Sequence, residues 1–153
     1  MKKILIIERT SVTRKQIKNI FKNETNLEFI EADTFKKAMD ALQTETPNIL
    51  LIVLGMHSVT EEINGSREVV SEFLLKYMMN EMKILSSPPK ILTVTSRYLP
   101  LADDFKDKKL AERIIKYIDS HFDSSRIITR PFTDEEFIAA IKSALPQYNF
   151  MSI

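Results

Sequence analysis

Two opposite charges, Glu8 and Arg9, stand where a run of apolar residues gives way to a helix signal in "ILIIERTS". The apolar run before them predicts a buried strand, and the Thr-Ser pair after them is typical of a turn that starts a helix. In an open α/β sheet, ligands and catalytic groups gather beyond the carboxyl ends of the strands. The pair could therefore be an ordinary surface ion pair, or it could contact an anion or a partner.

Signatures of enzymes are missing from the sequence. It has no Gly-rich phosphate loop, no nucleophile elbow and no pair of histidines at metal-binding spacing, since the two histidines are His57 and His121. The chain also has no cysteine, which excludes disulfides, thiolate catalysis and Cys-based metal sites. We therefore expect no catalytic residue, no metal and no cofactor.

Composition and charge restrict the class of partner. The 153 residues are 44% hydrophobic and 28% charged, with a formal net charge of +1, so no basic surface for nucleic acid or an anionic membrane is indicated.

The first residues resemble the start of a signal peptide, but Glu8 and Arg9 end the apolar run too early. The longest apolar run, "ILLIVLGM", is shorter than a membrane span. We expect a soluble, cytoplasmic domain.

Strands and helices are predicted to alternate along the chain. Short segments rich in Ile, Leu and Val predict strands at Lys3–Ile7, Glu28–Glu31, Ile49–Leu54, Ile91–Thr95 and Arg126–Thr129. Apolar residues at helical spacing predict helices at Ser11–Lys22, Phe35–Leu42 after Asp33 as N-cap, Val69–Met82, Leu110–Ile118 and, after a capping box at Thr133, up to Leu145. This order predicts an α/β fold with a five-stranded parallel sheet and helices on both faces.

A single domain is expected over residues 1–145. The chain has only two glycines and no Ser/Gly linker, which gives no sign of an internal boundary. Residues 146–153 are expected to be a frayed C-terminal tail or the start of a linker.

Four segments resemble the receiver domain of two-component response regulators, a (βα)5 flavodoxin-like fold. They are "KKILIIERTSVTRKQIKNIF" for the first strand and helix, "TPNILLIVLGM" for the third strand, "PPKILTVTSR" for the fourth strand and "RIITRPFTDEEFIAAI" for the fifth strand and last helix. They occur in the family's order and at its spacing, and the resemblance covers nearly the whole chain.

The resemblance also implies that the family's phosphorylation chemistry is degenerate. Its phosphoacceptor aspartate aligns with Val53, which has no oxygen to attack phosphorus or to bind metal. Its Mg²⁺-binding acidic pair aligns with Glu8 and Arg9, so one carboxylate remains and the other is replaced by a cation. Because Mg²⁺ needs oxygen ligands and negative charge, this site should not hold it. Arg9 could instead pair with Glu8 and stand in for the metal.

Three further positions match the family's switch residues only in part. Thr95 aligns with the hydroxyl that contacts the phosphoryl group, Arg130 replaces the family's lysine, and Ile127 replaces its switch aromatic. Thr95 could instead satisfy backbone at a strand end, and Arg130 could pair with Glu8 or a carbonyl. The alternative is that Arg9, Thr95 and Arg130 converge on a small anion.

The favoured function is that of a pseudo-receiver in bacterial signal transduction. It would act as a phosphorylation-independent interaction module for a signalling protein, with homodimerisation as one outcome, through the fourth helix, fifth strand and last helix. The alternative is an anion-sensing domain. An active phosphoacceptor at a displaced residue is disfavoured: His57 reads as an exposed loop residue, and Asp103 and Asp104 lie too far along the chain to replace Val53.

Overall fold

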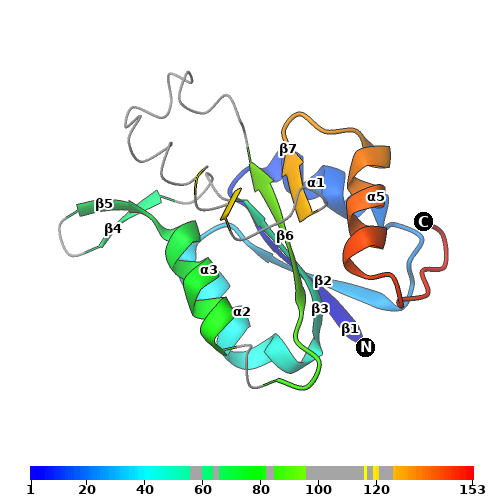
Figure 1. Ribbon diagram of the computed structural model, residues 1–153, viewed down its shortest axis with the longest axis horizontal. Helices are drawn as coiled ribbons and strands as arrows, with labels where there is room; N and C mark the ends of the chain where they lie inside the picture. The colour runs from blue at the N-terminus through cyan, green and yellow to red at the C-terminus, as the bar shows by residue number, and fades with distance from the viewer. Residues whose placement is uncertain (56–59, 64–65, 82–84, 96–115, 117–118, 121–125) are drawn as a thin grey trace.

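The structure is a computed structural model that describes residues 1–55, 60–63, 66–81, 85–95, 116, 119–120 and 126–153. Its centre is a five-stranded parallel sheet in the order β2-β1-β3-β6-β7 (Figure 1). The strands are β1 (Lys2–Ile7), β2 (Leu27–Ala32), β3 (Ile49–Gly55), β6 (Lys90–Thr95) and β7 (Ile127–Thr129). Every predicted strand is confirmed to within one residue at each end. The signal is clearest for β3, whose continuous apolar run is what a strand covered on both faces requires.

Helices cover both faces of this sheet (Figure 1). Helices α1 (Ser11–Ile20) and α5 (Asp134–Ala144) pack on one face, whereas α2 (Phe35–Glu45) and α3 (Val70–Glu81) pack on the other. A short 3-10 turn, η1 (Thr46–Asn48), leads from α2 into β3. The predicted helix at Leu110–Ile118 falls almost entirely outside the described residues.

The pleat of β1 divides the core into two apolar clusters. Ile4 and Ile6 point toward α1 and α5, and Leu5 and Ile7 point toward α2 and α3. All four side chains are fully buried, as expected for a strand whose successive side chains face opposite layers. Strand β1 therefore contacts both helix layers.

Two helix starts test the capping predictions. Thr133 caps α5 as predicted: its hydroxyl accepts a hydrogen bond from the Glu136 backbone N–H at 3.1 Å. The N-cap predicted at Asp33 is wrong by one residue, because the hydroxyl of Thr34 accepts from the Lys37 backbone N–H at 3.2 Å. Asp33 instead forms an ion pair with Lys37 at 2.9 Å.

An antiparallel hairpin, β4 (Thr60–Ile63) and β5 (Ser66–Val69), precedes α3 and was not predicted. It projects away from the five-stranded sheet (Figure 1). Ile63 pairs with Ser66, so only Asn64 and Gly65 separate the two strands. Asn-Gly between short extended segments is the strongest local signal for a two-residue hairpin, and the sequence prediction overlooked it.

Some of the C-terminal residues pack against the domain. Tyr148, Phe150 and Ile153 are partly buried against the cluster beneath α1 and α5. In the part of the chain that is described, no helix is both long and apolar enough to cross a bilayer.

Candidate functional site

The carboxyl edge of the sheet brings together the ends of β1, β6 and β7, from which Glu8, Thr95 and Arg130 come. Strands β1 and β3 are neighbours although β2 lies between them in the chain, so the order of the sheet reverses here. In doubly wound sheets this reversal is the usual place for a ligand site. The topology therefore places the predicted residues at the position where function is expected.

Glu8 is a buried carboxylate, with only 1% of its surface exposed. One carboxylate oxygen, Oε1, accepts the backbone N–H of Thr10 at 3.1 Å and lies 3.7 Å from Nη1 of Arg130. Its own backbone N–H bonds to the carbonyl of Ala32 at 3.1 Å, which extends the pairing of β1 with β2 by one residue. A buried charge needs such partners, because their loss would leave its desolvation uncompensated.

Arg9 does not take the place expected for it. Its side chain is exposed, and the arginine that forms the ion pair with Glu8 is Arg130, from the opposite end of the chain. Successive residues at a strand end point in different directions, so the neighbour in sequence is not the neighbour of the carboxylate. Among the described residues, a cation beside this carboxylate is Arg130, in agreement with one of the two pairings that the sequence offered.

Arg14 fixes the backbone on which Glu8 and Arg9 sit. Its Nη1 donates to the carbonyl oxygens of both residues at 2.8 Å, and its Nε donates to Oε1 of Glu31 at 3.1 Å. Lys18 binds the second oxygen of Glu31 at 3.1 Å. Burial opposes ionisation of Glu31, but Lys18 and Arg14 outweigh it and lower the pKa of its carboxyl. The resemblance included Arg14 among the matching residues, but this bracing role was not predicted from the sequence.

Val53 lies in the core. Its side chain is fully buried in the apolar cluster under α1 and α5, and its strand neighbours are Ile6 and Leu92. It supplies no polar atom to the edge where Glu8 and Arg130 meet.

Thr95 and Arg130 are joined through the backbone, since the N–H of Arg130 donates to the carbonyl of Thr95 at 2.7 Å. Thr95 is fully buried, and Ile127 packs against the cluster on the α2 and α3 face. The peptide between Arg130 and Pro131 is cis. The structure thus brings Glu8, Thr95 and Arg130 to one edge, with Arg9 exposed beside them.

A fixed cation lies beside the buried carboxylate in the described part of this edge. Among the described residues no group of three metal-ligating side chains occurs, and the guanidinium of Arg130 already lies beside the carboxylate. His57, Asp103 and Asp104 lie outside the described residues. An anion at this edge would have to share Arg130 with Glu8 and would meet the carboxylate's repulsion.

Comparison with solved structures finds the same fold in receiver domains. The PhyR response regulator receiver domain of Erythrobacter litoralis has a TM-score of 0.62 at 16% identity, over 99% of this chain and 95% of that one. The signal receiver domain of an HD domain-containing protein from Pseudomonas fluorescens Pf-5 also scores 0.62 at 16% identity, over 95% and 94%. A Thermotoga maritima response regulator scores 0.57 at 14% identity, over 96% and 99%.

No family model and no curated protein sequence matches the chain. At these identities the likeness establishes the receiver-domain fold alone.

Proposed function

We propose that the chain is a receiver-type domain of bacterial two-component signalling that works without phosphorylation. In this proposal it is a non-enzymatic, cytoplasmic protein-interaction module that needs no cofactor and binds neither nucleic acid nor membranes. The observation that carries the proposal is the fully buried Val53 in β3, where the receiver domains that it resembles carry an aspartate. Arg9 in place of the family's second acidic residue supports it, because the change removes one of the carboxylates that the resemblance assigns to Mg²⁺ binding.

Acetyl phosphate tests the absence of phosphorylation. We expect the intact mass of the protein to stay unchanged after incubation with acetyl phosphate and Mg²⁺, because Val53 offers no nucleophilic oxygen. Intact-mass spectrometry makes the measurement, with an active receiver domain treated in parallel as the positive control. An acid-labile phosphoryl adduct on this chain would contradict the proposal.

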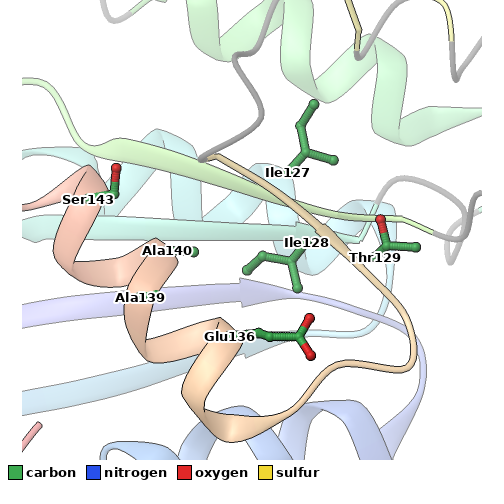
Figure 2. Close-up of a pocket in the computed structure, with 7 residues that line it drawn as sticks. All are labelled: Ile127, Ile128, Thr129, Glu136, Ala139, Ala140 and Ser143. Carbon is green, nitrogen blue, oxygen red and sulfur yellow. The ribbon is translucent and has the colours of Figure 1, made fainter.

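The surface that we propose for the interaction lies between β7 and α5. A groove of about 400 Å³ runs between these elements, lined by Ile128 from the strand and by Ala139 and Ala140 from the helix (Figure 2). Ile127 also borders it, but its side chain points away from α5 (Figure 2). Glu136 stands at one end of the groove (Figure 2). β7 is an edge strand of the described sheet, and small alanines on α5 leave room for side chains of a partner. An apolar floor with a polar end is typical of a protein contact.

Self-association through this groove can be measured on the chain alone. We expect concentration-dependent dimers in sedimentation equilibrium, unaffected by acetyl phosphate with Mg²⁺. Ala139→Arg should weaken dimerisation about tenfold or more, because it places a long cation in the groove. Lys142→Glu is the matched control, since Lys142 is exposed on the same helix but does not line the groove. Dimers that persist unchanged in Ala139→Arg would contradict the assignment of this surface.

The anion-sensing alternative keeps Arg9, Thr95 and Arg130 as its site. The exposed position of Arg9 and the ion pair of Arg130 with Glu8 make it the weaker of the two. An anion would need to separate Arg130 from a carboxylate that is 1% exposed.

A further inference from the structure

Glu24, in the turn after α1, holds the C-terminal end of the described chain. Its side chain is buried, with 5% of its surface exposed. Oε2 accepts the backbone N–H of Met151 at 2.8 Å, and Oε1 accepts the backbone N–H of Ser152 at 2.7 Å and the hydroxyl of Ser152 at 3.1 Å. One carboxylate thus takes two successive backbone N–H groups from a segment more than a hundred residues away in the chain, at separations of 127 and 128 residues.

Aromatic contacts accompany this carboxylate. The ring of Phe150 lies 4.6 Å from Tyr148 and 6.3 Å from Phe21, centroid to centroid. Phe21 in turn lies 5.9 Å from Phe29 on β2. Rings at these separations attract one another beyond the burial of their area. The C-terminal residues therefore cover an aromatic surface formed by Phe21, directly after α1, and Phe29 of β2.

The charge of Glu24 is tied to this contact. Burial alone would raise the pKa of its carboxyl, but the hydrogen bonds from the Met151 and Ser152 backbone, the Ser152 hydroxyl and the Ile153 backbone together outweigh burial and lower it. The same carboxylate, together with burial, raises the pKa of Tyr148. A buried carboxylate that lost these donors would pay its full desolvation cost, so Glu24 and the C-terminal residues depend on each other.

A short exposed joint separates these residues from α5. Pro146 and Gln147 are exposed, and Pro146 has no backbone N–H to donate. The backbone hydrogen bond described across the joint runs from Tyr148 N–H to the carbonyl of Leu145, at 3.1 Å. Leu145 itself is anchored to the helix by a bond to the carbonyl of Ile141 at 2.9 Å. Movement about the joint therefore leaves α5 intact.

We propose that residues 146–153 form a latch, closed by the carboxylate of Glu24, that opens about Pro146 and Gln147 while the sheet stays folded. The closed latch covers the aromatic surface of Phe21, and the open latch exposes it. Closure requires a negative charge at Glu24 and a donor at Ser152, so a negative charge at Ser152 opens the latch. This inference does not depend on the proposed interaction function. The latch is closed by Glu24, Met151 and Ser152, whereas the proposed interaction surface lies on β7 and α5.

Amide hydrogen exchange of the full chain tests the latch. In Glu24→Gln the side-chain amide can accept with only one oxygen and turns an NH₂ toward the donors. We expect protection of the Met151 and Ser152 amides to fall about tenfold or more, since hydrogen bonds to a charged group are the strong ones. The β1 amides of Ile4 to Ile7 should keep their protection. Glu135→Gln, at an exposed carboxylate of α5, is the matched control and should change neither set.

A second variant leaves the buried carboxylate in place. Ser152→Asp puts a carboxylate against Glu24, so it should lower the same protections and remove the nuclear Overhauser contact between the Phe150 and Phe21 rings. Ser152→Ala removes only the hydroxyl bond and should have the smaller effect. Unchanged protection of Met151 and Ser152 in both charge variants would overturn the latch. Equal loss of protection in β1 would overturn it too, because the segment would then be an inseparable part of the core.

Discussion

Replacing Val53 with aspartate is expected to destabilise the domain by about 3–5 kcal/mol at pH 7, and not to produce a phosphorylatable one. The valine side chain is fully buried between the sheet and the α1 and α5 layer, among residues such as Ile6 and Leu92. An aspartate carboxylate at this position would lose its hydration on folding. Among the described residues, no cation or N–H group is placed to pair with it. Chemical denaturation, read as the midpoint and slope of the unfolding curve, measures the loss.

Val53→Asn is the matched control for this substitution, since it has the same shape as aspartate and no charge. It should be destabilised less at pH 7, because an unpaired buried amide costs less than an unpaired buried charge. Burial raises the pKa of an aspartate above its ordinary value of about 3.9. The loss of unfolding free energy in Val53→Asp is therefore full above the raised pKa of the folded state. It shrinks as the pH falls from there toward about 3.9. A stable Val53→Asp protein that acquires a phosphoryl group from acetyl phosphate would contradict this account.

The sheet could be predicted from the sequence because its signal is local. Ile49 to Leu54 is apolar throughout and short, as expected for a strand covered on both faces. The cap of α5 was likewise local, with Thr133 and Glu136 three residues apart. Such features depend on residues that are close in the chain.

The residues around the candidate site could be located, and their pairing could be narrowed to two arginines. The sequence placed Glu8 at a strand end and offered both adjacent Arg9 and distant Arg130 as its partner, and the structure pairs it with Arg130. Which side chain reaches a carboxylate depends on the strand register and on where each backbone points, and neither is encoded locally. The bond of Glu24 to Met151 and Ser152 escaped prediction for the same reason.

Removal of the Arg130 side chain is expected to cost about 1–3 kcal/mol of stability, and removal of Arg9 no more than about 0.5 kcal/mol. Arg130 is partly buried and lies 3.7 Å from a carboxylate with 1% exposure, so Arg130→Ala takes the described cation from a buried charge. Arg9 is exposed, and Arg9→Ala should leave the ion pair between Glu8 and Arg130 unchanged. Thermal and chemical unfolding of both alanine variants gives the comparison.

A double-mutant cycle separates the ion pair from the packing of the arginine stem. Combining Arg130→Ala with Glu8→Gln should cost less than the sum of the two single changes, because the second change removes the charge that the first leaves uncompensated. Additive losses would mean that the two groups do not interact. If Arg9→Ala were the costlier single change, and if phosphate raised the melting temperature in a saturable way that Arg130→Ala abolished, the edge would be an anion site. In that case Arg130 would be shared between Glu8 and a ligand, and the sensing alternative would replace the interaction module.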